Sequence, residues 1–286
     1  MTTICICGAG TMGSGIAQVA AASGFNTILF DVSAEAVQNA SGRLQKDLCA
    51  LLDKGKITAE KRDDILGRIQ FVSAVSQCRA DVVIEAIVEK PDVKISLFNQ
   101  LAAINKADTI FASNTSSLSI STLAKGVPHP ERVAGLHFFN PAPLMKLVEV
   151  VKGEQTSEPV VSQLVNLTKS LGKVPVVCKD SPGFIVNRVA RPYYIESLRL
   201  AEEGMASFEQ IDRLLEGVGF RMGPFKLMDL IGNDVNYAVS CSVYEQLGQP
   251  ERLKPSYIQK EKVDKGELGK KTGKGYYSPC PPKGET

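Results

Sequence analysis

The stretch "TTICICGAGTMGSGIAQVAAASGFNTILFD", residues 2–31, is the starting point for predicting the fold. A short β-type run ends at a GxGxxG loop, a helical pattern follows and stops at a glycine, and a second β-type run ends at Asp31. This order predicts a strand, loop, helix and strand in succession. The start of the helix would then offer free N–H groups and a positive dipole end to a phosphate.

The glycine loop predicts a site for the pyrophosphate of a dinucleotide. Its candidate contacts are Gly8, Ala9, Gly10, Thr11, Met12 and Gly13. The three glycines suit a tight turn, close backbone approach to the pyrophosphate, and close helix packing. Asp31 can accept hydrogen bonds from the adenosine ribose and would repel a 2′-phosphate, and no Arg or Lys follows it in "FDVSAEA". NAD is therefore predicted over NADP, the alternative being a tight turn with structural glycines only.

Strands and helices continue to alternate up to residue 182. Helical patterns cover residues 34–53, "TAEKRDDILGRI", a stretch from Pro91, and residues 157–171. The β-type runs are "IQFV", "DVVIEAI", "TIFAS", "RVAGLHFF", "KLVEVV" and "KVPVVC". The alternation predicts an α/β fold, a Rossmann-type doubly wound sheet with helices on both faces.

The pattern changes at "KDSPGF", where Pro182 and Gly183 interrupt the chain. Beyond them no β-type run stands out, and four stretches with helical spacing end at glycine or proline. We therefore expect two domains, residues 1–182 as the NAD-binding domain and 183–286 as an all-α domain. The second is apolar for its size, which predicts that it packs on another copy of the chain.

Composition and charge argue against several classes of function. The formal net charge of +2 gives no electrostatic case for nucleic acid or an anionic membrane. No apolar stretch approaches the roughly 20 residues of a membrane span, and the first residues resemble neither a secretory signal nor an Arg-rich leader. The seven cysteines form no CxxC pair and no zinc spacing. They predict reduced, mostly buried thiols in a cytoplasmic protein without a metal.

His137 and Glu149 stand in two apolar β-type runs, "RVAGLHFF" and "KLVEVV". If these runs pair like a hairpin through "NPAPLM", the two side chains can meet, and the carboxylate would orient the imidazole as a general base. Alternatively, His137 is a core histidine satisfied by backbone and Glu149 lies at the surface. Residue types alone favour this second interpretation.

Hydroxyl and amide side chains follow another predicted strand, in "FASNTSSLSIS", residues 111–121. In an open α/β sheet, ligands bind at the carboxyl ends of the strands. Asn and Ser are also common caps and turn formers. The residues alone leave both interpretations open.

Seven motifs occur in the order of a known family. They are "GAGTMGSGIAQVAA", "VIEAIVE", "FASNTSSL", "GLHFFNPAPLMKLVEVV", "SPGFIVNR", "MGPFKLMDLIG" and "GKKTGKGYY". Together they closely resemble the 3-hydroxyacyl-CoA dehydrogenase family, in particular its short 3-hydroxybutyryl-CoA dehydrogenase branch. The resemblance covers essentially the whole chain. It implies an N-terminal NAD-binding domain, a helical C-terminal domain that dimerises, and an acyl-CoA substrate.

The resemblance also implies catalytic roles. His137 would take the proton from the substrate 3-hydroxyl, and Glu149 would orient it and stabilise its cationic form. Ser116 and Asn187 would hydrogen-bond the substrate oxygen, and Asn140 would help to hold the nicotinamide and the substrate. Hydride would pass from substrate C3 to the nicotinamide.

Further contacts implied by the resemblance concern the cofactor and coenzyme A. Glu89 and Lys94 would serve the nicotinamide half of the cofactor, and Lys271 would reach the cofactor from the C-terminal tail. Lys54 would meet a CoA phosphate, although a cation at a solvated helix end is favourable in any case. Longer family members carry a serine where this chain has Asp47, which weakens one expected CoA contact.

Two other functions are weighed against this one. A related dehydrogenase of free hydroxy acids or sugar acids would have the same architecture, but Lys54 and the short chain favour the CoA ester. A structural or NAD-sensing protein could keep the fold without activity. The complete set of Ser116, His137, Asn140, Glu149 and Asn187 argues against it, because a silent site has no need of all five.

Overall fold

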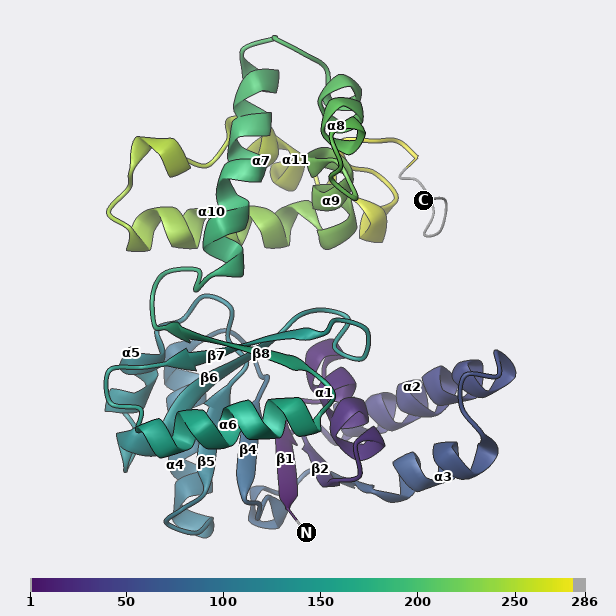
Figure 1. The fold of residues 1–286 in the computed structure, drawn as a ribbon, viewed down its shortest axis with the longest axis vertical. Coiled ribbons are helices and arrows are strands. Elements are labelled where there is room, and N and C mark those ends of the chain that lie inside the picture. The colour runs from purple at the N-terminus through teal and green to yellow at the C-terminus, as the bar shows by residue number, and fades with distance from the viewer. Residues whose placement is uncertain (1, 280–286) are drawn as a thin grey trace. The chain divides into compact units, whose positions relative to one another are not determined.

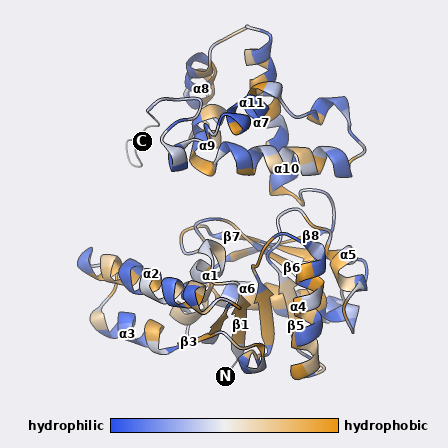
Figure 2. Cartoon of the chain, turned by 180° about the vertical axis from the view of Figure 1, so that it is seen from behind, coloured by the Kyte–Doolittle hydropathy of each residue, from blue (hydrophilic) through white to orange (hydrophobic). Residues whose placement is uncertain are grey.

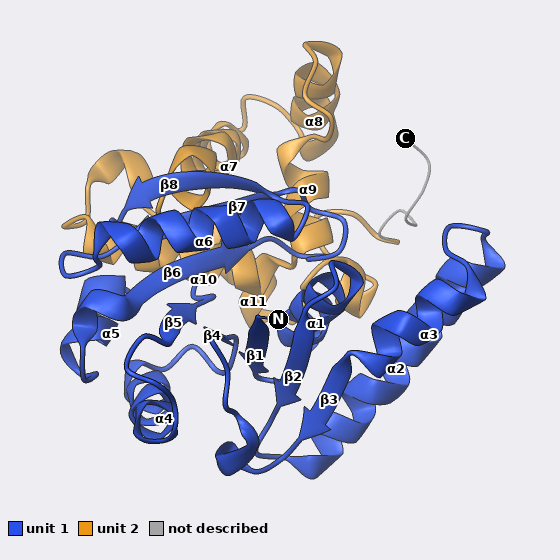
Figure 3. Ribbon diagram, turned by 60° about the horizontal axis from the view of Figure 1, so that its bottom comes forward, with its two compact units in different colours: residues 1–181 blue, residues 182–286 orange. Residues whose placement is uncertain are grey.

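A computed structural model describes residues 2–279. The chain divides into two compact units, Met1–Ser181 and Pro182–Thr286 (Figure 3). Each unit has its own hydrophobic clusters, so each is described separately.

The first unit is built on one eight-stranded sheet (Figure 1). Its strands are β1 (Thr3–Cys7), β2 (Asn26–Phe30), β3 (Ile69–Val72), β4 (Val82–Glu85), β5 (Ile110–Ser113), β6 (Val133–Phe138), β7 (Leu147–Lys152) and β8 (Val174–Lys179). Their order is β3-β2-β1-β4-β5-β6-β7-β8, and only the β6–β7 pair is antiparallel. The order reverses between β1 and β4. The loops after these two strands therefore flank the switch point at which such sheets bind ligands.

Helices connect most of the strands. They are α1 (Thr11–Ala22), α2 (Ala34–Asp53), α3 (Ala59–Gly67), α4 (Pro91–Ile104), α5 (Ile120–Lys125) and α6 (Glu158–Ser170), with 3-10 turns at Val75–Gln77 and Pro130–Arg132. Local capping explains several starts: Thr58 accepts from the Lys61 amide at 3.2 Å, and Pro91 occupies the first turn of α4. The helix α5 was not predicted, because six residues are too few to show a helical period.

The sheet is buried on both faces, which confirms the predicted doubly wound α/β fold. Ile4 and Ile6 of β1 belong to a cluster with apolar residues of α1, α2 and α6. Side chains alternate along a strand, so Cys5 and Cys7 point to the other face. On that face Phe98 of α4 packs on Phe111 of β5, with ring centroids 5.6 Å apart. Figure 2 shows the strands as largely hydrophobic and α2 and α3 as largely hydrophilic.

The second unit is helical, as predicted, and its described residues contain no strand beyond an isolated bridge between Gly269 and Lys274. It contains α7 (Val186–Glu202), α8 (Phe208–Gly217), α9 (Pro224–Ile231), α10 (Asn233–Gln246) and α11 (Tyr257–Asp264), with 3-10 turns at Glu251–Leu253 and Lys270–Thr272. The spacing in "GPFKLMDLIGNDVNYAVSCSVYEQLG" predicts one helical stretch, but Gly232, at φ +107°, separates α9 from α10 within it. Only a residue tolerant of positive φ allows this sharp change of direction.

The cysteines only partly match their prediction. Cys5, Cys7 and Cys78 are buried, Cys178 and Cys241 are half-buried, Cys49 is exposed, and Cys280 lies outside the described residues. The expectation of mostly buried thiols is therefore wrong for Cys49, which lies on the solvent side of α2. Between residues 2 and 279, no helix has the length and apolar character needed to span a membrane.

Candidate active site

The glycine loop lies between β1 and α1, and each of its three glycines suits its position for a different structural reason. Gly8 has φ +107°, and a Cβ there would lie 2.5 Å from the Ala86 carbonyl oxygen. A Cβ on Gly13 would lie 1.7 Å from the Gly8 carbonyl oxygen, so α1 can approach β1 only through glycine. A Cβ on Gly10 would meet nothing within 4 Å. This open space at the N-cap of α1, which has no side-chain cap, fits the pyrophosphate of a dinucleotide.

Asp31 follows β2 and is anchored to the glycine loop. Its Oδ2 accepts from the Ala9 amide at 2.8 Å, and its Oδ1 accepts from the Ser33 amide at 3.0 Å. Together with Gly8 and Gly10 it lines a cavity of about 750 Å³. The carboxylate can thus meet a ribose hydroxyl in this cavity, because each of its oxygens has a further lone pair.

His137 and Glu149 lie directly opposite each other in the antiparallel pair β6–β7. The His137 Nδ1 is 2.7 Å from the Glu149 Oε2. Both residues are buried, and Glu149 is 0% exposed. The interpretation that residue types alone favoured, with Glu149 at the surface and His137 satisfied by backbone, is therefore wrong. Composition could not reveal the strand register that brings the two side chains together.

The loop after β5 shows the cap and turn role that the sequence had left open. Asn114 Oδ1 accepts from the Phe138 amide at 2.8 Å, which ties this loop to the end of the His137 strand. Ser119 caps α5 by accepting from the Thr122 amide at 3.1 Å. Ser116 lies between them, and its own amide donates to Glu89 Oε1 at 3.2 Å. Cap and turn residues therefore hold the segment that presents Ser116.

A buried network of ion pairs and hydrogen bonds supports the loop after β5. Lys94, 1% exposed, donates to Glu85 Oε1 at 2.6 Å and lies 3.1 Å from Glu89 Oε2. Glu85, 0% exposed, also accepts from Ser113 Oγ at 2.6 Å. Burial alone would raise the pKa of Glu89, but Lys94 and hydroxyl donors, including Thr115, outweigh it and lower that pKa. The sequence analysis missed Glu85, although a carboxylate at the end of a buried strand is a usable signal.

Lys173 is a second residue that the sequence analysis missed. Its Nζ donates to the carbonyl oxygens of Ala142 at 2.6 Å and Met145 at 2.8 Å. It therefore holds the segment that joins β6 to β7, between His137 and Glu149. Burial lowers the pKa of Lys173. No local pattern in "LGKVP" indicates this role.

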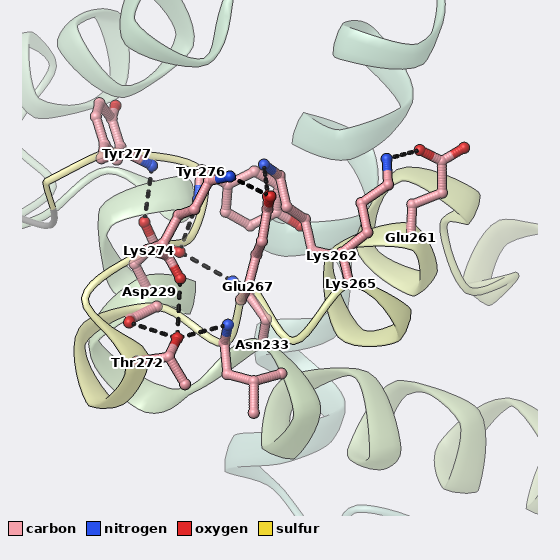
Figure 4. A network of polar contacts seen from close by, with 12 residues as sticks. Asp229, Asn233, Glu261, Lys262, Lys265, Glu267, Thr272, Lys274, Tyr276 and Tyr277 are labelled. Carbon is pink, nitrogen blue, oxygen red and sulfur yellow. Dashed lines mark hydrogen bonds and ion pairs between the residues drawn. The ribbon is translucent and has the colours of Figure 1, made fainter.

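In the second unit, the motif "GKKTGKGYY" is held on α9 by Asp229 (Figure 4). Asp229 accepts from the amides of Tyr276 and Tyr277, both at 3.0 Å, and from Asn233 Nδ2 at 2.9 Å. A Cβ on Gly275 would lie 1.9 Å from an Asp229 oxygen, so this docking requires glycine.

The remaining predicted site residues are distributed over both units. Lys54 is the exposed C-cap of α2, and Asp47 lies exposed on the same helix. Asn187 is in the first turn of α7, and its carbonyl oxygen accepts from Arg191 Nε at 3.0 Å. Lys271 Nζ lies 2.6 Å from Asp234 Oδ2. In the described part of the chain, no group of three or more His, Cys, Asp or Glu side chains could hold a metal ion.

Comparison with known proteins gives matches along nearly the whole chain. Residues 3–181 match the model of the 3-hydroxyacyl-CoA dehydrogenase NAD binding domain, and residues 183–279 match the C-terminal domain of the same family. A 3-hydroxyadipyl-CoA dehydrogenase of Escherichia coli (strain K12) is 51% identical over 96% of this chain, which spans 58% of that relative's length.

Two further relatives are of similar length to this chain. The mitochondrial hydroxyacyl-coenzyme A dehydrogenase of Sus scrofa is 42% identical, with 96% of this chain and 90% of the relative covered. The crystal structure of an (S)-3-hydroxybutyryl-CoA dehydrogenase from Ralstonia eutropha superposes with a TM-score of 0.93 at 39% identity, covering 97% of this chain and 99% of that one. The chain therefore belongs to the 3-hydroxyacyl-CoA dehydrogenase family, with that family's NAD-binding domain as its first unit.

Proposed function

We propose that the chain is an NAD-dependent (S)-3-hydroxyacyl-CoA dehydrogenase for short acyl chains, interconverting 3-hydroxybutyryl-CoA and acetoacetyl-CoA. The observation that carries the proposal is the buried His137–Glu149 pair, with its 2.7 Å contact, on β6 and β7 of the NAD-binding domain. The relatives from Escherichia coli and Ralstonia eutropha are both named for 3-hydroxyacyl-CoA substrates. Their names support a CoA ester as the substrate here.

In this proposal His137 is the general base. Glu149 engages Nδ1, and the proton from the substrate 3-hydroxyl would go to Nε2. The carboxylate then stabilises the imidazolium that forms. NAD, when bound, accepts the hydride from substrate C3. In the reverse direction His137 returns its proton to the alcohol oxygen.

Three polar residues complete the proposed substrate site. Ser116 and Asn187 would donate hydrogen bonds to the substrate oxygen, and Asn140 would help to hold the nicotinamide and the substrate. The position of Ser116 is supported by the Glu89 contact to its amide. Asn140 directly precedes the segment held by Lys173.

The proposed cofactor and CoA contacts differ in how they would act. Glu89 would meet the nicotinamide half of NAD directly, whereas the buried Lys94 would act by positioning Glu89. Lys271 would reach the cofactor from the C-terminal motif. Lys54, at the exposed end of α2, would bind a CoA phosphate.

We also propose a cytoplasmic homodimer formed through the helical unit. Met205, Leu214 and Val218 are each about 70% exposed around α8. Exposed large apolar side chains within and next to one helix favour a protein interface there. Sedimentation of the unaltered chain and of Leu214→Glu should show a dimer that the charged variant weakens.

The first test compares substrates and coenzymes. Reduction of acetoacetyl-CoA and of free acetoacetate is followed by the loss of reduced-nicotinamide absorbance, each with NADH and with NADPH. We expect fast turnover only with the CoA ester and NADH. Turnover of the free acid would favour a hydroxy-acid dehydrogenase, and no turnover with either would favour a protein without activity.

The second test removes the base. His137→Ala should lower kcat by about 10²–10⁴, the usual contribution of a general base, with near-normal NADH affinity. His129→Ala is the matched control, because His129 is exposed and lies in the turn before β6. Activity of His137→Ala within a factor of about two of the unaltered chain would refute the assignment.

A further inference from the structure

Arg43 brings a cation to the glycine loop that the order of the sequence does not reveal. It lies in the middle of α2 and is exposed. Its Nη2 donates to the Ala9 carbonyl oxygen at 3.1 Å and lies 3.5 Å from Ser14 Oγ. Both partners belong to the loop and first turn where a dinucleotide phosphate would bind.

Asp31 binds the amide group of Ala9, the residue whose carbonyl oxygen Arg43 contacts. Its Oδ2 accepts from the Ala9 amide at 2.8 Å, while Arg43 donates to the Ala9 carbonyl oxygen. A carboxylate and a guanidinium therefore flank a single loop residue, beside the cavity lined by Gly8, Gly10 and Asp31. In dinucleotide-binding folds an acid in this place receives the ribose 2′-hydroxyl, whereas a nearby Arg accommodates a 2′-phosphate.

The Arg43 guanidinium has more N–H donors than its two hydrogen bonds use. Its two hydrogen bonds both use Nη2, and an Arg side chain carries five N–H donors. A planar guanidinium also suits a phosphate better than a carbonyl oxygen, because two N–H groups can meet two phosphate oxygens. No Arg or Lys directly follows Asp31 in the sequence, but in the folded chain Arg43 contacts the same loop residue as Asp31.

We propose that Arg43 is a second specificity-determining residue, a latent 2′-phosphate contact that the charge of Asp31 masks. This inference rests on the proposed use of NAD. The preference for NAD over NADP then comes from repulsion by Asp31, not from the lack of a cation. Neutralising Asp31 alone should admit NADPH, with no need to introduce a new basic residue.

The experiment measures dissociation constants of NADH and NADPH on the full chain, from the fluorescence of the reduced nicotinamide at low salt. The proteins are the unaltered chain, Asp31→Asn, Arg43→Gln, the double variant, and Asp31→Asn with Lys46→Gln. Lys46 is the matched control, because it is an exposed cation of α2 with no bond to the glycine loop.

Asp31→Asn should tighten NADPH by roughly 10- to 100-fold, the range of a charge-assisted hydrogen bond. Adding Arg43→Gln should abolish this gain, and adding Lys46→Gln should keep most of it. A gain that survives Arg43→Gln, or no gain while NADH still binds, overturns the proposal. If the unaltered chain binds neither coenzyme, the proposed function itself fails.

A variant at Asp31 could also lose its fold, since the carboxylate anchors two amides. The comparison then rests on Arg43→Gln alone in the presence of Asp31. The ratio of NADPH to NADH dissociation constants should still rise in Arg43→Gln, because the guanidinium offsets part of the repulsion between Asp31 and a 2′-phosphate. An unchanged ratio in a folded Arg43→Gln protein overturns the proposal.

Discussion

Replacing Glu149 with glutamine tests the proposed dyad with the smallest change of shape. Glu149 is 0% exposed in β7, and its Oε2 lies 2.7 Å from the Nδ1 of His137 in β6. Glutamine keeps the volume and one carbonyl oxygen and removes the negative charge. We expect the strand pair to form as before, because its backbone register does not depend on this side chain.

The magnitude follows from what the carboxylate does for the imidazolium. Two unit charges about 4 Å apart interact by about 4 kcal/mol at an effective dielectric constant near 20. Losing this interaction when His137 gains its proton corresponds to about 10³ in rate. The amide group of glutamine can also donate to Nδ1, which would place the ring proton on Nε2 and remove the base. Glu149→Gln should therefore lower kcat by about 10²–10⁴.

The assay is the steady-state reduction of acetoacetyl-CoA by NADH, with NADH affinity measured separately. Glu154→Gln is the control, because Glu154 is an exposed carboxylate shortly after β7. The decisive comparison is the double variant, because residues that act as a unit are not additive. Glu149→Gln should have little further effect once His137 is alanine. A full additional loss in that background would refute the idea that Glu149 acts through His137.

Three further predictions concern the framework of the site. Gly13→Ala should abolish NADH binding or folding, because its Cβ would lie 1.7 Å from a carbonyl oxygen. In Gly42→Ala the new Cβ meets no atom within 4 Å, so this variant should be more stable by about 1 kcal/mol in a denaturant titration. Lys173→Met leaves the buried carbonyl oxygen of Ala142 and the partly buried one of Met145 without this donor, and it should cost about 1–3 kcal/mol of stability with a lower kcat. Unchanged values would contradict the positioning role of Lys173. The pKa of Glu89 is lowered, so its stabilising contacts are fully present above about pH 4.3 and lost only as the pH falls through the folded value. The melting curves of the unaltered chain and Glu89→Gln should therefore converge in acid, and a constant gap would contradict this.

Most of the fold could be predicted because its signals are local. The helix α2 spans Ala34–Asp53, the range expected from its periodicity, and β3 spans the expected Ile69–Val72. The exceptions are also local in origin. The six residues of α5 are too few for a period, and the break at Gly232 requires a positive φ that spacing does not show.

The site was less predictable because its contacts join distant residues. His137 and Glu149 could be named as candidates, but only the antiparallel register decided between a buried pair and two unrelated residues. Arg43 lies 34 residues from Ala9 in sequence, and Lys173 lies 31 from Ala142. No window of neighbouring residues contains such a contact. The contacts of Arg43 and Lys173 depend on where the fold places α2 and the residue before β8.

The antiparallel pair β6–β7 would allow one sheet to hold both the cofactor site and the proposed His137–Glu149 pair. The strands β1, β4, β5 and β6 run parallel, so their carboxyl ends lie at one edge of the sheet. The glycine loop, Glu89 and Ser116 follow the ends of β1, β4 and β5, and His137 lies near the end of β6. In a parallel continuation, the partner of His137 would have to come from the same edge, where the loops are most mobile. Because β7 runs in the opposite direction, Glu149 instead comes from the interior of a strand, where its side chain is buried. In the proposed function, His137 would then meet the ligand at the carboxyl end of β6, while Glu149 remains buried in the sheet.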